Sequence, residues 1–166
     1  MYLGIKSTTL SPPAIVLAKY EEKEMKTIFG GNLTTRNPEI DMVTKSFTHT
    51  ANEGHPNPAF KSVKFNSIYT GPAPDIADGS VPLIVWPHGG PHALTPNTFY
   101  REVDFFNQLG YGVLFINFRG SLGAGQESVE SLLGQVGDTD VKDCFQAMNE
   151  CLKVKFPKSR IVSDIL

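Results

Sequence analysis

The sequence lacks a long apolar run, a strong excess of charge and a secretory leader. None of its 166 residues lies in a stretch of about 20 consecutive apolar residues, so we expect no segment that spans a membrane. The N-terminus has no basic flank, and the apolar run at residues 14–18 is too short for a signal peptide. The net charge of -2 leaves little basic surface for phosphate groups. We therefore expect neither a membrane nor a nucleic acid among the partners of this chain.

Cysteine is also scarce, because Cys144 and Cys151 are the only two in the chain. On the helix that we expect here, their spacing places them about 10.5 Å apart along the axis. A disulfide needs Cα atoms within about 7 Å, so the two cysteines are expected to stay unpaired. Unpaired cysteines are typical of a reducing compartment, and together with the missing leader they predict a cytoplasmic protein.

Patterns for metal ions and phosphate groups are missing as well. The histidines and carboxylates do not form a recognisable set of zinc ligands. The glycines Gly120, Gly123 and Gly125 have the spacing G-x-x-G-x-G, which differs from the G-x-G-x-x-G of dinucleotide-binding loops. We therefore expect no metal and no cofactor.

Short strand patterns dominate the N-terminal part of the chain. Residues 14–20 and 25–29 predict two strands. Residues 37–58 are polar and contain three prolines, so we expect loops in which His49 and His55 are solvated. Residues 60–69 alternate between apolar and polar side chains, which predicts a half-buried antiparallel strand. The Gly/Pro/Asp-rich residues 71–80 are expected to form a connector.

From Val81 onward, apolar strands alternate with helical patterns, which predicts a parallel sheet. We expect strands over residues 83–86, 112–118 and 160–166, and a helix over 99–109 that is capped by Thr98. A second helix is expected to begin after Asp138 and to run to about residue 153. Its apolar positions are predicted to face inward, namely Val141, Cys144, Phe145, Met148, Cys151 and Leu152.

The first of these strands leads into the loop sequence His88-Gly89-Gly90-Pro91-His92. A glycine pair lets backbone N–H groups come close to a ligand, because no Cβ intervenes. Spacing alone leaves two interpretations open, a loop that binds an oxyanion and a simple tight turn. For the flanking histidines, the alternatives are a catalytic base, a zinc pair and a role in supporting the loop. The zinc pair is disfavoured because no third ligand is recognisable.

Arg119 follows the expected strand over residues 112–118. An arginine at this place can pair with a substrate carboxylate or form a structural ion pair, and the second role is favoured.

Several longer stretches resemble one known family. VPLIVWPHGGPH, LGYGVLFINFRGSLGAGQESVESLLGQVG and DVKD are similar to the catalytic domain of acylaminoacyl-peptidases, which belong to the prolyl oligopeptidase family of serine peptidases. The resemblance is strong over residues 81–156 and weaker over residues 1–80. It implies an α/β fold: the N-terminal half of an α/β-hydrolase domain with a mostly parallel sheet. Residues 1–58 would be the remnant of a β-propeller with its connection, and residues 59–166 the partial peptidase domain.

The resemblance also implies an activity, the release of an N-acylated amino acid from the N-terminus of short peptides. It makes Gly90, or its neighbour Gly89, a donor to the oxyanion and gives His88, Pro91 and His92 a supporting role. It requires no metal or cofactor and allows a homo-oligomer.

The Ser/Asp/His triad of that family is not recognisable in this sequence. There is no G-x-S-x-G, and Ser121 is preceded two places earlier by Arg119 instead of glycine. We therefore expect a truncated chain that is inactive alone, and the alternative is a non-catalytic chain that binds or interferes with full-length subunits. A lipase or esterase of the HGG type would share the loop but not the NFRGSLGAG and DVKD stretches.

Overall fold

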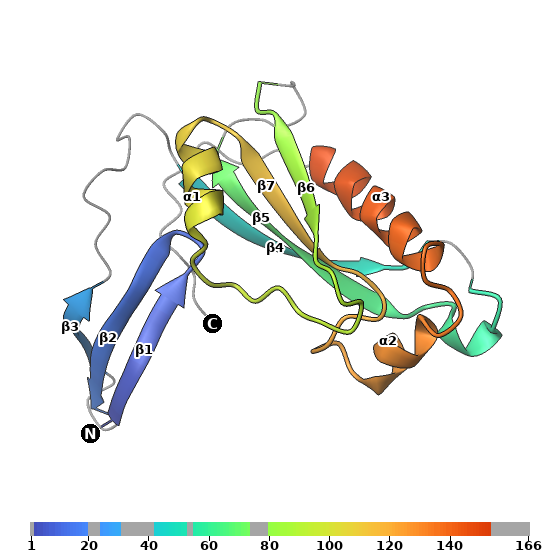
Figure 1. Cartoon of the computed structure of the whole chain (residues 1–166), viewed down its shortest axis with the longest axis horizontal. Helices are drawn as coiled ribbons and strands as arrows, with labels where there is room; N and C mark the ends of the chain where they lie inside the picture. The colour runs from blue at the N-terminus through green and yellow to red at the C-terminus, as the bar shows by residue number, and fades with distance from the viewer. Residues whose placement is uncertain (1, 20–23, 31–41, 53–54, 74–79, 154–166) are drawn as a thin grey trace.

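Two β-sheets and a small number of helices make up the computed structural model, which describes residues 2–19, 24–30, 42–52, 55–73 and 80–153 (Figure 1). The elements are β1 (Tyr2–Thr8), β2 (Ser11–Lys19), β3 (Glu24–Gly30), β4 (Met42–Thr50), the 3-10 helix η1 (Pro58–Phe60), β5 (Lys64–Pro72), β6 (Leu83–Pro87), α1 (Arg101–Gln108), β7 (Gly112–Asn117), α2 (Gln126–Ser131) and α3 (Thr139–Leu152).

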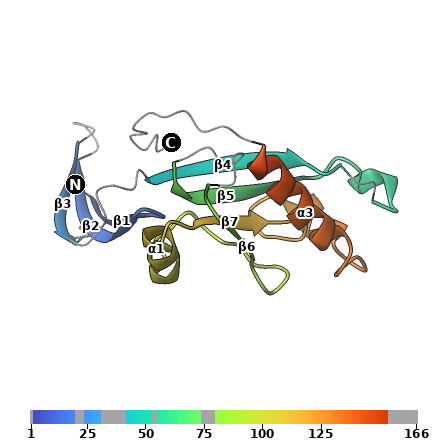
Figure 2. The same ribbon diagram turned by 90° about the horizontal axis from the view of Figure 1, so that it is seen from above.

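The first sheet is antiparallel, with the strand order β1-β2-β3. Its second and third strands confirm the prediction for residues 14–20 and 25–29. The turn between β1 and β2 contacts the second sheet, because the hydroxyl groups of Thr9 and Thr44 are hydrogen-bonded at 2.6 Å. Figures 1 and 2 show this sheet at one end of the molecule and α3 toward the other.

The second sheet has the order β4-β5-β7-β6 and is mixed. β4 and β7 both pair with β5 in antiparallel fashion, and β6 pairs with β7 in parallel. The prediction of a mostly parallel sheet is therefore wrong for the described residues. The reason is that only β6 and β7 are joined through a helix, α1, whereas β4 and β5 form a long antiparallel pair.

The sequence interpretation missed two strands, β1 and β4. Residues 42–50 were expected among loops because Thr, Ser and Lys dominate them, yet Thr is a good strand former. Alternate side chains on β4 reach the core, with Val43 and His49 buried. The division into residues 1–58 and 59–166 stays a prediction. β4 and β5 lie on opposite sides of this predicted boundary and are hydrogen-bonded to each other.

The central strands are buried on both faces because helices cover each side. On one face, α1 packs its Val103 against Val113 and Phe115 of β7. On the other face, α3 packs Ala147 and Cys151 against a cluster that includes both β5 and β7. The buried strand expected over residues 112–118 is confirmed by β7. β5 was expected to be half-buried and antiparallel, and only the second expectation is right. Its last two residues, 71 and 72, come from the expected connector, while residues 74–79 lie outside the described part.

The rotation of α3 differs from the prediction. Its buried residues are Thr139, Asp143, Ala147 and Cys151. Val141 is 44% exposed and Phe145 60% exposed, and Leu152 also lies at the surface. The prediction is right for Cys151 and in part for Cys144, which packs against the core, and it is wrong for the three exposed residues. The helix is rotated because the buried Asp143 also faces inward.

Both predicted helix caps need correction. Asp138 does precede α3, but its side chain makes no capping hydrogen bond and pairs with Lys142 instead. α1 begins at Arg101, after Tyr100, and the Thr98 hydroxyl donates to Ser7 Oγ rather than capping the helix. The strand expected over residues 160–166 lies outside the described residues.

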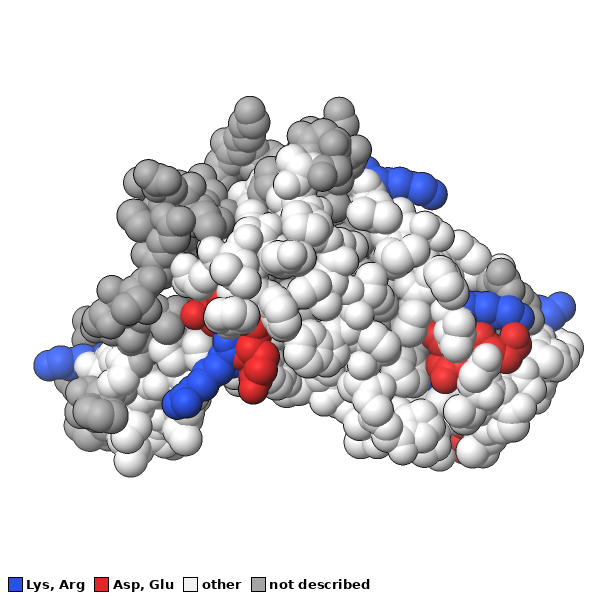
Figure 3. All heavy atoms as spheres, turned by 45° about the horizontal axis from the view of Figure 1, so that its top comes forward, with Lys and Arg blue, Asp and Glu red and all other residues white. Residues whose placement is uncertain are grey.

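Charged side chains are sparse on the face that Figure 3 displays. The Lys and Arg side chains seen there are scattered, and several stand beside acidic ones. Most of this face is formed by uncharged residues. The expectation that the chain does not bind nucleic acid stays a prediction.

Candidate functional site

The predicted loop lies where the parallel strands β6 and β7 end. Parallel strands bring their carboxyl ends to the same edge of a sheet, and ligands bind at such edges in α/β proteins. The His88–His92 loop therefore meets the segment that follows β7. His88 Nε2 lies 2.7 Å from Ser121 Oγ, and His92 Nδ1 lies 2.8 Å from the Gly120 carbonyl oxygen. Both histidines thus connect the loop to residues 120–121, and their supporting role stays a prediction.

The two glycines of the loop are exposed, and Pro91 beside them is half-buried. Gly90 has φ +136, a conformation that favours glycine, and a Cβ added there would lie 3.0 Å from Ala93 Cβ. A Cβ on Gly89 would meet no atom within 4 Å. No described residue accepts a hydrogen bond from either glycine N–H. These two backbone donors are therefore open to a ligand.

A buried asparagine fixes the far end of the loop. Asn117 Oδ1 accepts from the Thr95 N–H at 2.8 Å, and Asn117 Nδ2 donates to the Thr95 carbonyl at 3.1 Å. Asn117 Nδ2 also donates to Asn66 Oδ1 on β5. The sequence analysis missed Asn117, although an asparagine at the end of an otherwise apolar buried strand is a usable signal for such a role.

Arg119 forms an ion pair with Asp143 of α3. Its Nε and Nη2 groups donate to both carboxylate oxygens at 2.8–3.1 Å, and its backbone N–H donates to Oδ2 at 2.9 Å. The two side chains are 0% and 1% exposed. Burial raises the pKa of the Asp143 carboxyl, and the hydrogen bonds from Arg119 oppose this shift. Of the two roles predicted for Arg119, the ion pair is the one present.

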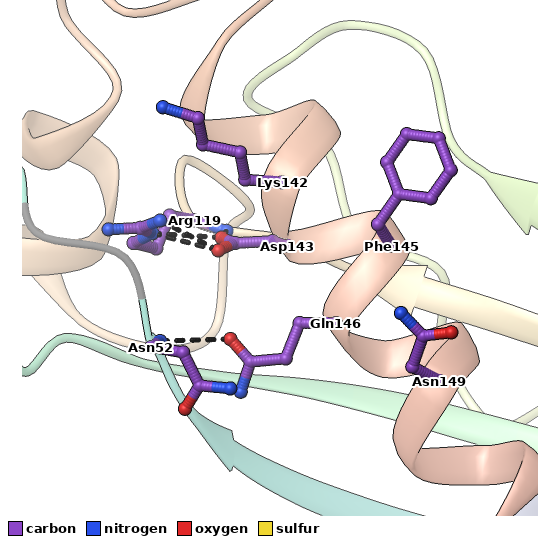
Figure 4. A pocket seen from close by; sticks show the side chains of 7 residues that line it. All are labelled: Asn52, Arg119, Lys142, Asp143, Phe145, Gln146 and Asn149. Carbon is purple, nitrogen blue, oxygen red and sulfur yellow. Dashed lines mark hydrogen bonds and ion pairs between the residues drawn. The ribbon is translucent and has the colours of Figure 1, made fainter.

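A pocket of about 360 Å³ lies beside this ion pair (Figure 4). Figure 4 shows Arg119 and Asp143 turned toward each other, with Gln146 bonded to the backbone of Asn52. Nε and Nη2 of Arg119 are engaged with Asp143, whereas its buried Nη1 has no hydrogen-bond partner among the described residues. The remaining lining residues are Asn52, Lys142, Phe145, Gln146 and Asn149.

Comparisons with known proteins agree with this geometry. The family model described as "Prolyl oligopeptidase family" matches residues 97–162. The acylamino-acid-releasing enzyme of Arabidopsis thaliana is 39% identical over 103 residues, which cover 61% of this chain and 13% of that protein. The enzyme of the same name from Mus musculus is 35% identical over 114 residues, or 66% of this chain and 16% of that protein.

The chain is thus similar to the prolyl oligopeptidase family.

Solved structures of the family share the fold. A puromycin hydrolase covers 95% of this chain with a TM-score of 0.68 at 24% identity. An acylaminoacyl peptidase from Pyrococcus horikoshii covers 92% with a TM-score of 0.70 at 20% identity. The resemblance expected from the sequence is thereby confirmed, and the fold is that of part of an α/β-hydrolase enzyme. The chain spans 13% and 16% of the length of the two curated relatives above, and 23% of each of these two solved chains.

A second Ser–His pair lies away from the His88–His92 loop. His49 Nε2 is 2.7 Å from Ser67 Oγ, and His49 Nδ1 is 2.6 Å from Glu150 Oε2. The order serine, histidine, carboxylate is that of a catalytic triad. Ser67, however, is fully buried within β5, so no substrate reaches its hydroxyl group. Burial raises the pKa of Glu150, but hydrogen bonds from Gln146 and His49 outweigh it and hold the pKa below its usual value.

The prediction that His49 and His55 are solvated is wrong. Both are buried, and His55 Nε2 donates to the Ser131 carbonyl at 2.8 Å while its Nδ1 accepts from the Asn57 N–H. Their polar neighbours in the sequence suggested exposure, but His49 lies in β4 and faces the core, and His55 is covered by η1 and its neighbouring residues. Each histidine has hydrogen-bond partners for both ring nitrogens, which removes the cost of burying them.

An apolar groove of about 460 Å³ runs between the end of β6 and α3. His88 and Phe118 line it on the sheet side, and Val141, Phe145 and Met148 line it on the helix side. In the part of the chain that the structure describes, no cluster of three or more His, Cys, Asp or Glu side chains could hold a metal ion. None of the described helices combines the length and the hydropathy needed to cross a membrane.

Proposed function

We propose that this chain is part of a serine peptidase that releases an N-acylated amino acid from the N-terminus of short peptides. The observation that carries the proposal is the exposed Gly89–Gly90 backbone at the carboxyl end of β6, with N–H groups that no described residue uses. The relatives are named acylamino-acid-releasing enzymes, and this supports the substrate class.

In the proposed reaction, a serine hydroxyl attacks the carbonyl carbon of the acylated residue and an acyl-enzyme forms. Negative charge collects on the carbonyl oxygen, and the N–H of Gly90, or that of Gly89, is one of two donors that bind it. A single donor of this kind contributes about 2.7–4 kcal/mol to stabilising the transition state. The reaction uses no metal and no cofactor.

We infer that the 166-residue chain alone does not form the acyl-enzyme. It contains no G-x-S-x-G sequence, which carries the serine in α/β-hydrolases. Among the described residues, the serines bonded to histidine are Ser67 and Ser121, and both are fully buried. The chain therefore supplies the oxyanion loop and not the nucleophile.

A fluorophosphonate probe tests this inference directly. The purified 166-residue chain is expected to remain unlabelled, and an acetyl-amino-acid amide is expected to remain unhydrolysed. A probe adduct on any serine of the folded chain, identified by mass spectrometry, would contradict it. For the wider proposal, an acetyl-amino-acid amide and a simple ester are compared as substrates of a protein that carries this loop together with the family's serine. Preference for the ester would favour an HGG-type lipase or esterase.

The alternative proposal is a non-catalytic chain that binds full-length subunits or itself. It is favoured by the groove beside β6 and by Val141 and Phe145, which expose apolar surface on α3. Sedimentation of the chain, alone and mixed with a full-length relative, distinguishes the two proposals. We further propose a cytoplasmic location, supported by the unpaired Cys144 and Cys151.

A further inference from the structure

The Gly89 carbonyl links His88 to the proposed oxyanion donor. His88 Nδ1 lies 2.9 Å from the Gly89 carbonyl oxygen. A carbonyl oxygen only accepts hydrogen bonds, so Nδ1 must carry a proton. In the neutral imidazole, Nε2 is then an acceptor, and the Ser121 hydroxyl 2.7 Å away must donate to it. The contacts therefore define a single tautomer for neutral His88.

Peptide geometry carries this constraint to Gly90. The Gly89–Gly90 peptide bond is trans, since the cis bond in this loop joins Gly90 to Pro91. In a planar trans peptide, the C=O and N–H groups point in opposite directions. The bond that draws the Gly89 carbonyl toward the His88 ring therefore turns the Gly90 N–H away from that ring. Two glycines flank this peptide plane, so little else in the local chain resists its rotation.

The His88 ring is itself held firmly. It stacks on Phe118 with ring centroids 4.6 Å apart and an interplanar angle of 23°. Ser121 is fully buried, and its backbone N–H donates to the Phe118 carbonyl at 2.9 Å. Both partners of the ring thus belong to the segment directly after β7, which is the most deeply buried strand of the sheet.

We propose that His88 is a positioning residue that aims the Gly90 N–H outward, and that Ser121 and Phe118 hold its ring for this purpose. The use of that N–H as an oxyanion donor rests on the proposed function, whereas its direction and the tautomer of His88 do not. Ser121, although bonded to histidine, serves the loop and not as a nucleophile.

Nitrogen-15 NMR of the full 166-residue chain tests the tautomer. When its imidazole is neutral, His88 is expected to carry its proton on Nδ1, and Ser121→Ala is expected to keep this tautomer, because the Gly89 carbonyl alone requires it. Protonation of neutral His88 on Nε2 in the unchanged chain would overturn the proposal. A Ser121→Ala variant with its proton on Nε2 of His88 would do so as well, because the Gly89 carbonyl would then not determine the tautomer.

Two substitutions of His88 test the roles of its two ring nitrogens separately. The amide N–H of His88→Asn can replace Nδ1 as the donor to the Gly89 carbonyl, whereas the longer side chain of His88→Gln reaches toward Ser121 instead. Acetate serves as a small oxyanion, and the Gly90 amide resonance reports its binding. Acetate is expected to bind His88→Gln about tenfold more weakly, as is typical when one charge-assisted hydrogen bond is lost, and His88→Asn nearly as well as the parent chain.

His88→Asn is the matched control for His88→Gln, because both variants remove the ring and only the first keeps a donor at the Gly89 carbonyl. Equal weakening in both variants would show a general disturbance of the loop and would overturn the specific role of His88. If the Gly90 N–H binds acetate as expected but no protein containing this loop cleaves acylated peptides, the proposed function fails and the positioning role stands.

Discussion

The ion pair between Arg119 and Asp143 gives the sharpest stability prediction. Asp143→Asn preserves the shape of the side chain and one carbonyl acceptor, but it removes the negative charge. The guanidinium group of Arg119 then remains charged in a site where both side chains are at most 1% exposed. Removing one partner of a buried ion pair costs about 3–5 kcal/mol. Because small domains are stable by about 5–15 kcal/mol, we expect a large part of the free energy of unfolding to be lost.

The same helix offers a matched control. Asp138 pairs with Lys142 at the surface, where the side chains are 52% and 39% exposed. Such pairs contribute about 0–1 kcal/mol, so Asp138→Asn is expected to change the free energy of unfolding by less than about 1 kcal/mol. The two substitutions are chemically the same, and each removes an acidic partner of an ion pair at α3, but only the Arg119–Asp143 pair is buried.

Urea unfolding, followed by circular dichroism and by the fluorescence of Trp86, measures both variants through linear extrapolation. A double variant, Arg119→Met with Asp143→Leu, removes both charges and is expected to recover much of the stability lost in Asp143→Asn. If Asp143→Asn costs no more than Asp138→Asn, the reasoning from burial is refuted. Failure of the double variant to recover stability would show that the hydrogen bonds, and not the unpaired charge, dominate.

Three further predictions concern glycine, cysteine and pH. Gly90→Ala is expected to cost about 1–3 kcal/mol because of its backbone conformation and its contact with the loop, whereas Gly89→Ala costs less, as thermal unfolding would reveal. Burial raises the pKa of Cys144 and of Cys151 to about 11. Both thiols are therefore expected to react slowly with a thiol reagent at pH 7.5 until urea unfolds the chain. Rapid labelling of the folded chain would contradict this expectation. Folding lowers the pKa of Glu150, so this carboxylate contributes its full stabilisation above the ordinary pKa of 4.5, and the stabilisation is lost as the pH falls below that value. Glu150→Gln should therefore make the free energy of unfolding less dependent on pH in acid. An unchanged slope in acid unfolding curves would contradict the role of Glu150.

The C-terminal strands and helices could be predicted from the sequence because their signals are local. The strand over residues 83–86 and the one over residues 112–118 are apolar runs bounded by proline or glycine. The helix after Asp138 also begins and ends close to the expected residues. In each case the neighbouring residues alone decide the structure, so a short segment of sequence is sufficient to predict the element.

The features that could not be predicted depend on partners far away in the sequence. α3 turns its Asp143 inward because Arg119 lies there, and no count of apolar residues reveals that pairing. β4 becomes a strand because β5 is available beside it, and this burial turns His49 into a core residue. The histidines of the glycine loop were expected to support it, but their partners became identifiable only once the ends of β6 and β7 had been placed together.

Asn117 anchors the loop after β6 at its far end. Its side-chain amide bonds to both polar groups of the Thr95 backbone, as a neighbouring strand would. The last residue pair of β6 and β7 is Pro87 with Ile116, so the side-chain amide of Asn117 extends the hydrogen bonding beyond the end of this pairing. Only residues 88–94 span the interval between these two fixed points. The conformational entropy of the loop is therefore lost when the chain folds rather than when a ligand arrives, and a ligand would meet donors that are already in place.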